Sequence, residues 1–119
     1  MDTVNHIYWN KPIKYLILRT SNKEQRYLLD SEADKWLDIV NGAINSTIVT
    51  EYEFKQEDKS SDVIYFCIKY RDGSLTLIED DVCDKFFQYV DFCMTYDQLR
   101  NGASYDMPNF ISGEPLTTI

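Results

Sequence analysis

The chain contains 119 residues, of which 44% are hydrophobic and 27% charged, as in ordinary soluble globular proteins. A chain of this length is expected to form one domain with its own core. It contains no apolar run of about 18 residues that would predict a membrane span, and its first residues lack the pattern of a secretory signal. We therefore expect a cytoplasmic protein with no membrane contact.

The net charge of −8 is unevenly distributed along the chain. Residues 1–29 carry five basic and two acidic side chains, whereas residues 30–62 carry nine acidic and three basic ones. Residues 79–97 carry six acidic side chains and one basic one. This balance disfavours direct binding to nucleic acid, which requires a basic surface, and permits a basic protein partner. The sequence leaves open the alternative that the acidity serves only solubility.

Residues 1–12 are predicted to form a lead-in to two paired strands. The first strand, Ile13–Thr20, is apolar on both faces at its centre, which is typical of a strand with neighbours and cover on both sides. A polar turn over residues 21–23 then predicts that Gln25–Leu29 pairs back on it.

An amphipathic helix is predicted to begin at Asp30 or Ser31, either of which is able to cap it, and to stop near Asn45. Its apolar side chains fall within one arc of about 120° of the helical wheel, opposite its charged residues. The arc consists of Ala33, Trp36, Leu37, Val40, Ala43 and Ile44.

A third strand is predicted over Ser46–Phe54, where apolar and polar residues alternate. Glu51 and Glu53 then lie on its solvent face. The charged loop that follows adds Glu57 and Asp58 to the same acidic region.

The strongest local signal is a hairpin over Val63–Ile78. Two apolar runs flank Asp72 and Gly73, the usual residues of a two-residue type I′ turn. Placing both in the turn puts Ile68 opposite Leu77 on a buried face. The complete predicted face consists of Ile64, Phe66, Ile68, Tyr70, Leu75 and Leu77.

A second helix is predicted to begin at the acidic residues 79–81, to run to about Arg100 and to stop at Asn101 and Gly102. It has a wide apolar face that is expected to cover much of the sheet. Asp84 and Asp91 project from its polar side.

Phe92 and Leu99 also fall on the outer side of this helix. Either the C-terminal tail covers them, or they contact a partner. The tail, residues 103–119, is irregular but contains too many apolar residues for a solvated segment. We expect it to pack at least as far as Phe110.

These elements follow in the order ββαβββα, and the sequence shows no internal repeat. They predict a single α+β domain over residues 1–119, in which an antiparallel sheet of about five strands carries two amphipathic helices on one face.

Few residues offer chemistry. His6 is the single histidine, and it lies in the lead-in rather than beside a nucleophile. Cys67, Cys83 and Cys93 contain no CxxC pair and fall on apolar faces, so we expect unpaired, buried thiols. The acids at the start of the second helix lack the spacing of a calcium loop and suit the helix dipole. The sequence therefore predicts no enzyme, no metal and no cofactor.

A small acidic protein without catalytic residues is typical of inhibitors that neutralise a basic partner. We expect an immunity protein or antitoxin, bacterial or phage-encoded, that blocks a nuclease-type toxin or another nucleic-acid-processing enzyme. The candidate contact residues are Glu51, Glu53, Glu57, Asp58, Asp84, Asp91 and Phe92. The alternative is a structural or regulatory subunit of a larger assembly, with an apolar interface around Phe92 and Leu99.

Overall fold

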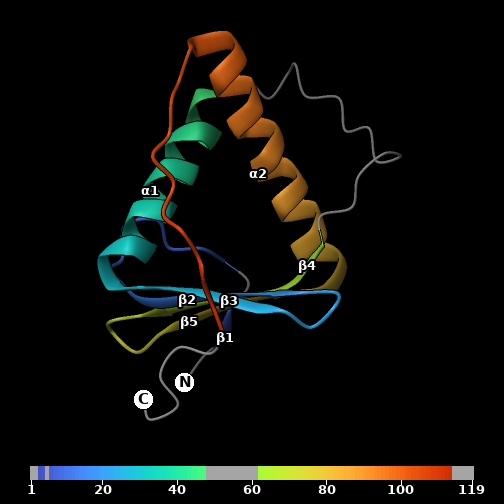
Figure 1. The fold of residues 1–119 in the computed structure, drawn as a ribbon. Helices are drawn as coiled ribbons and strands as arrows, with labels where there is room; N and C mark the ends of the chain where they lie inside the picture. The colour runs from blue at the N-terminus through green and yellow to red at the C-terminus, as the bar shows by residue number, and fades with distance from the viewer. Residues whose placement is uncertain (1–2, 5, 48–61, 114–119) are drawn as a thin grey trace.

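In the computed structural model, which describes residues 3–4, 6–47 and 62–113, six strands form one sheet and two helices pack on it (Figure 1). The elements are β1 (Thr3–Val4), β2 (Ile13–Thr20), β3 (Gln25–Leu29), α1 (Asp30–Ser46), β4 (Val63–Tyr70), β5 (Leu75–Glu79), α2 (Asp80–Asn101) and β6 (Ile111–Ser112).

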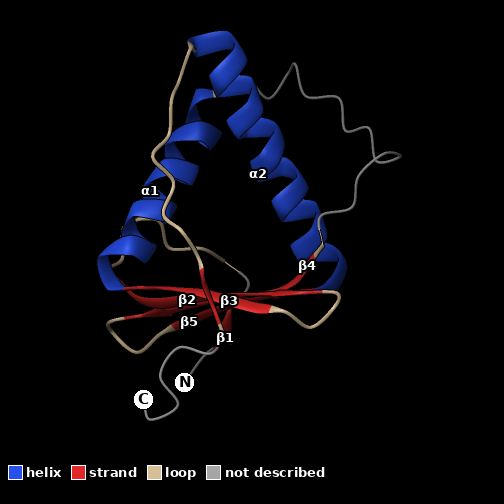
Figure 2. Ribbon diagram, viewed as in Figure 1, coloured by secondary structure: helices blue, strands red, loops and turns tan. Residues whose placement is uncertain are grey.

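The strands lie in the order β1-β5-β4-β2-β3-β6, and all of these neighbours are antiparallel except the short pair β1 and β5. Figure 2 shows both helices on the same face of the sheet. The predicted α+β class, an antiparallel sheet with two helices, is therefore confirmed.

Helix α1 follows its predicted pattern. The buried side chains are Ala33, Trp36, Leu37, Val40 and Ala43, and the partly buried Ile44 packs against the same core. The helix ends at Ser46, and Thr47 is its C-cap. The strand predicted over Ser46–Phe54 therefore does not begin at Ser46, and the rest of that prediction, from residue 48 on, lies outside the described residues.

Aromatic side chains fill the core between the sheet and the helices. Phe66 of β4 stacks on Phe86 of α2 with ring centroids 5.8 Å apart and meets Phe87 edge-on at 5.1 Å. Trp36 of α1 lies 5.6 Å from Phe66 and 6.4 Å from Phe110 of the tail. The tail runs along the α1 side of the molecule to β6, so it closes the core on that side (Figure 1).

The hairpin formed by β4 and β5 has a longer loop than predicted. Asp72 and Gly73 lie in the turn as predicted, but the loop has three residues, 71–73. The Gly73 N–H donates to the Tyr70 carbonyl at 3.1 Å, and the Tyr70 N–H donates to the Ser74 carbonyl at 3.0 Å. Gly73 alone has a positive φ, 91°. A type I turn followed by a left-handed glycine needs one such residue, whereas the predicted type I′ turn needs two.

The longer loop shifts the pairing by one residue, so the predicted buried face is wrong on β5. On β4 the prediction is wrong at Ile64, which is 38% exposed. Leu77 lies opposite Cys67, and Thr76 takes the predicted place of Leu77 opposite Ile68. Leu75 and Leu77 consequently point to the sheet face away from the helices, because residues on a strand alternate between faces.

Hydrogen bonds explain why a threonine occupies the helix side of β5. The Tyr8 N–H donates to the Tyr70 hydroxyl at 3.0 Å, and that hydroxyl lies 2.8 Å from the fully buried hydroxyl of Thr76. Thr76 donates in turn to the His6 carbonyl at 2.6 Å. This chain satisfies a buried polar group and ties the lead-in to the hairpin, which a leucine cannot do.

The fold contains a structural repeat, although none was predicted from the sequence. Each repeat consists of an eight-residue strand, four connecting residues, a five-residue strand and a helix that follows directly. The second repeat starts 50 residues after the first. The residues with a positive φ recur with the same offset, as Lys23 and Gly73 and as Asp30 and Asp80.

The two repeats are related by a pseudo-two-fold axis perpendicular to the sheet. Ile17 of β2 pairs with Cys67 of β4, and these are equivalent positions of the two repeats. The axis therefore passes between them, at the centre of the sheet.

The two helices begin at equivalent positions of the repeats, and neither begins with the predicted side-chain cap. Leu29 and Glu79 are the N-cap residues, and neither helix has a side-chain cap hydrogen bond. The predicted cap at Asp30 or Ser31 is therefore wrong. Each strand passes into its helix through an aspartate in the left-handed conformation, which aspartate tolerates better than most residues.

Candidate functional site

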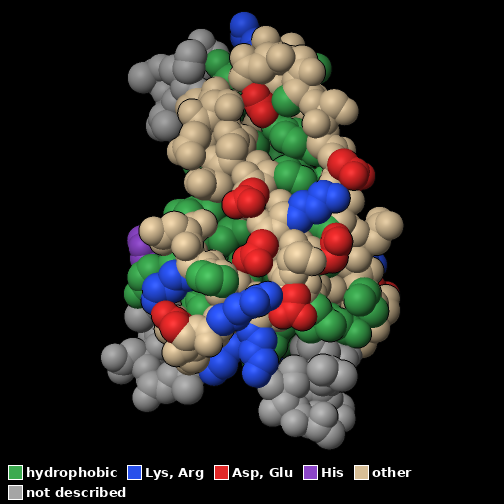
Figure 3. Space-filling view, turned by 90° about the vertical axis from the view of Figure 1, so that its left-hand side faces the viewer, with side chains coloured by type: hydrophobic (Ala, Val, Ile, Leu, Met, Phe, Trp, Pro, Cys, Tyr) green, Lys and Arg blue, Asp and Glu red, His purple; other side chains and the backbone are tan. Residues whose placement is uncertain are grey.

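The charged side chains separate into the two layers of the fold. The helical layer, which we define as residues 30–47 and 80–110, carries ten acidic and three basic side chains. The sheet layer, residues 6–29 and 62–79, carries seven basic and four acidic ones. In Figure 3 several Lys and Arg side chains gather at the sheet end, with acidic side chains on the part above. The net negative charge of the described chain is therefore a property of one layer.

An open groove of about 410 Å³ lies in this acidic layer, between α1 and the tail. It is lined by Ser31, Asp34, Lys35, Asp38, Ile39, Ser104, Tyr105 and Asp106. We call it the acidic groove, because three of its side chains are carboxylates and one is cationic.

The carboxylates of the acidic groove are not equivalent. Asp34 accepts a hydrogen bond from the Ile13 N–H at 3.0 Å, so it joins α1 to the start of β2. Asp106 forms an exposed ion pair with Lys35 at 3.3 Å, a kind of pair that contributes little to stability. Asp38 is exposed and has no ion pair or hydrogen bond within the described part of the chain. Asp38 is therefore the carboxylate with most capacity for an external cation.

A buried carboxylate holds the tail that forms one wall of the groove. Asp97, which is 7% exposed, accepts hydrogen bonds from the Tyr105 hydroxyl and, at 2.7 Å, from the Asn101 side chain. These bonds lower the pKa of Asp97. Burial and the bond to Asp97 raise the pKa of Tyr105 to about 12. Gly102, at φ 68°, ends α2 in the left-handed conformation, as predicted.

The predicted contact residues on α2 lie on a different surface from the groove. Asp84 and Asp91 are seven residues apart, so they lie on one side of the helix about 10 Å from each other along its axis. Asp91 is exposed, and Asp84 accepts a hydrogen bond from Gln88 at 2.8 Å. Phe92 is half-buried, and its ring lies 6.2 Å from that of Tyr96.

The remaining predicted contact residues, Glu51, Glu53, Glu57 and Asp58, lie outside the described residues. Sequence reasoning placed Asp34 and Asp38 on the polar side of α1 but did not single them out. Their spacing of four residues was the available signal, since it puts both on one helix face. Their proximity to Asp106 depends on the path of the tail.

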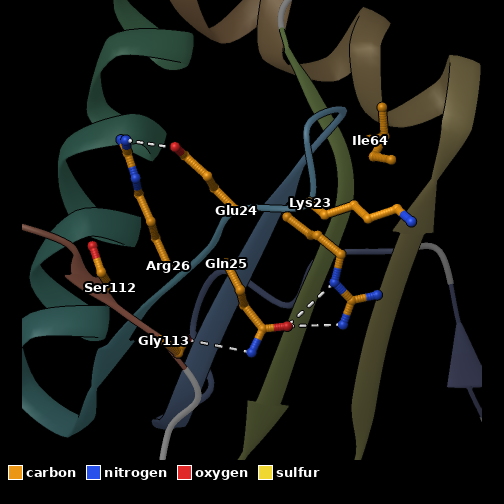
Figure 4. A pocket seen from close by; sticks show the side chains of 8 residues that line it. Lys23, Glu24, Gln25, Arg26, Ile64, Ser112 and Gly113 are labelled. Carbon is orange, nitrogen blue, oxygen red and sulfur yellow. Dashed lines mark hydrogen bonds and ion pairs between the residues drawn. The ribbon is translucent and has the colours of Figure 1, made fainter.

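A second cavity of about 870 Å³ lies at the start of β3, and most of its charged side chains form contacts within the protein (Figure 4). Arg19 donates twice to the Gln25 side chain, at 2.8 and 3.2 Å, and stacks 4.4 Å from the Tyr65 ring. Arg26 forms an ion pair with Glu24 at 3.3 Å. This cavity is wide and open, and its geometry selects no ligand.

The described residues offer little for catalysis. His6 is exposed, and its ring contacts Tyr8 edge-on at 5.1 Å rather than a nucleophile. The three cysteines are unpaired and buried, as predicted. Burial raises the pKa of Cys83 to about 12 and also raises that of Cys67, which disfavours the reactive thiolate.

Two further properties concern the described residues alone. No group of three or more His, Cys, Asp or Glu side chains among them is arranged to hold a metal ion. Neither α1 nor α2 combines the length and the apolar composition that a membrane crossing requires.

Comparison of the chain with protein-family models, with curated proteins and with solved structures found no match.

Proposed function

We propose that this protein binds and neutralises a basic protein partner through its acidic helical layer. The observation that carries the proposal is the separation of charge between the layers, because a uniform acidic surface would serve solubility equally well. Concentrating ten acids on one layer creates a directed field that accelerates encounter with a cationic surface.

The acidic groove supplies a place where such a partner would anchor. A lysine or arginine side chain that enters the groove would meet the unpaired carboxylate of Asp38. It would also replace Lys35 as the ion-pair partner of Asp106. Ile39 on the groove wall offers apolar surface to the methylene part of the same side chain. Arginine would gain most, because its planar group binds carboxylates through two hydrogen bonds.

The partner class that we propose is a nuclease-type toxin, which would make this protein an immunity protein or antitoxin. An enzyme that processes nucleic acid presents a cationic groove to phosphate, and an acidic layer is complementary to such a groove. Occupation of that groove would inhibit the enzyme without any chemistry by the inhibitor.

Charge reversal in the groove tests this proposal on the partner captured from a lysate of the source organism. Asp38→Lys with Asp106→Lys is expected to weaken binding at least about tenfold and to slow association. Asp84→Lys with Asp91→Lys tests the α2 surface in parallel. Glu24→Lys with Asp62→Lys is the matched control, because it makes the same change in net charge on the sheet layer.

The control variant is expected to bind within about twofold of the wild type, since its charges lie away from the contact. Equal losses in all three variants would show that only net charge matters. Unchanged affinity in both helical-layer variants would refute the proposal.

A second candidate function is a subunit of a larger assembly that docks through α2. Val82 and Leu99 are 58% and 79% exposed on this helix, so its outer surface offers unburied apolar groups. Salt separates the candidates in the same binding assay. Electrostatic docking weakens as ionic strength rises, whereas an apolar interface changes little.

A further inference from the structure

The sheet face opposite the helices forms an ordered surface to which the proposed function assigns no role. Its residues lie in three rows across β5, β4, β2 and β3. The rows are Glu79–Tyr65–Arg19–Gln25, Leu77–Cys67–Ile17–Tyr27 and Leu75–Lys69–Tyr15–Leu29. We call these twelve residues the open face, because both helices and the described tail lie on the other side (Figure 2).

The open face is mostly apolar and aromatic. Its middle row is uncharged, and the whole face carries three charged residues, Arg19, Lys69 and Glu79. A solvent-facing antiparallel sheet normally alternates apolar residues inside with polar residues outside. The apolar and aromatic side chains of the open face are half-buried, and Cys67 at its centre is 4% exposed. A sheet face of this composition suits contact with a second apolar surface better than contact with water.

The pseudo-two-fold axis organises the charged and aromatic groups of the open face. It relates Tyr65 to Tyr15 and Arg19 to Lys69. Each tyrosine lies opposite a cation of the other repeat, because β2 pairs with β4. Tyr65 lies opposite Arg19, and Tyr15 lies opposite Lys69. The Arg19 guanidinium lies 4.4 Å from the centre of the Tyr65 ring, within the range of a cation–π interaction.

From this arrangement we infer that the open face binds the open face of a second copy of the chain. A two-fold axis parallel to the strands places β4 of one copy over β2 of the other. Tyr65 then faces Arg19 of the second copy, and Lys69 faces its Tyr15. No charge meets a like charge, because each cation faces a tyrosine.

The apolar positions are complementary under the same axis. Leu77 faces Tyr27 of the second copy, Leu75 faces its Leu29, and Ile17 faces its Cys67. Two sheets that stack in this way lie about 10 Å apart, which is the usual spacing of packed β-sheets.

Other occupants fit the open face less well. A basic protein would meet two cations and a single acid. A single-stranded nucleic acid would need Arg19 for its phosphates, but Arg19 already donates two hydrogen bonds to the Gln25 side chain. The net charge of −8 also opposes a polyanion.

The contact is small, so the association belongs to the weak class. Four strands about 4.8 Å apart and five residues of about 3.4 Å each define a footprint of roughly 15–20 Å in each direction. Interfaces of that size lie below those of stable dimers. The assay must therefore reach protein concentrations of about 1 mM.

Sedimentation equilibrium of the full chain tests the inference. The average mass of the wild type is expected to rise with concentration towards that of a dimer. Ile17→Asp places a charge at the centre of the open face and is expected to abolish this rise. Val82→Asp is the matched control, since it introduces the same charge on an exposed site of the helical layer and should associate like the wild type.

A second variant, Leu77→Asp, guards against a folding defect, and circular dichroism checks that each variant retains its structure. Loss of association in both open-face variants, with the control unaffected, supports the inference. A wild type that stays monomeric at all concentrations overturns it, as does association that survives both open-face variants. Binding of a fluorescent single-stranded oligonucleotide that is lost in Ile17→Asp would assign the face to nucleic acid instead and equally overturn it.

Discussion

Hydrogen bonds to the carboxylate of Asp97 attach the tail to α2. Asp97 is almost completely buried, and its carboxylate depends on Tyr105 and Asn101 for hydrogen bonds. The lowered pKa of Asp97 means that its charged form is favoured in the folded state. Its contribution to stability is therefore present at neutral pH and is lost as the pH falls through the folded-state pKa.

Tyr105→Phe is expected to reduce the free energy of unfolding by about 1 kcal/mol at neutral pH, because a buried carboxylate loses one donor. The loss should shrink in acid, where Asp97 becomes protonated. Urea denaturation at several pH values measures it. Tyr27→Phe, on the open face, is the control and should show no such pH dependence. A pH-independent loss in Tyr105→Phe would contradict the role assigned to Asp97.

The two hairpin turns are equivalent elements with different residues at the same strained position. Gly73 has φ 91° in the β4–β5 turn, and Lys23 has φ 67° in the β2–β3 turn. A glycine adopts this conformation freely, whereas a side chain with a Cβ atom is disfavoured there. The first repeat therefore holds strain that the second lacks.

Substitutions at these two positions are expected to act in opposite directions. Gly73→Val should destabilise the fold by about 1–3 kcal/mol, because a β-branched residue resists a positive φ. Lys23→Gly should stabilise it or leave it unchanged, since relief of strain offsets the added backbone entropy of the unfolded chain. Thermal denaturation compares both with the wild type. A neutral Gly73→Val would mean that the turn changes its conformation at no cost.

At the scale of the whole molecule, an acidic helical layer lies on a mildly basic sheet layer. The proposed partner contact uses the first layer and the proposed contact with a second copy uses the open face of the sheet. The two surfaces lie on opposite sides of the fold, so both contacts are compatible in one assembly. The core between the layers is shared by both repeats, which makes it the cooperative unit of folding.

Thiol labelling tests burial on both sides of the sheet, because Cys83 lies in the core and Cys67 lies on the open face. Cys83 and Cys93 are fully buried, and Cys67 is nearly so. Their reaction with a thiol reagent is expected to be slow in the native protein and to accelerate across the urea transition. Variants with a single cysteine assign the rates. Rapid labelling of all three thiols in the native protein would contradict their burial on both sides of the sheet.

The amino-acid sequence by itself determined the local structure of this protein. The arc of Trp36, Leu37 and Val40 specified α1, and Asp72 with Gly73 specified a turn, because periodicity and backbone preference act over a few neighbouring residues. The α+β class followed from the succession of such elements. Charge counts along the chain already placed an excess of acids in the segments that became the helices.

Only the tertiary structure decided the hairpin register, the repeat and the acidic groove. Both the two-residue turn and the three-residue loop accept Asp-Gly. In the register set by the longer loop, buried Thr76 hydrogen-bonds with the Tyr70 hydroxyl and with the His6 carbonyl. The repeat is hidden because only some equivalent positions keep their residue type, such as Tyr15 with Tyr65, whereas the lengths of the elements and the positions with a positive φ recur. The groove joins Asp38 to Asp106 through the path of the tail. Contacts between residues so far apart in sequence depend on packing, which no local pattern encodes.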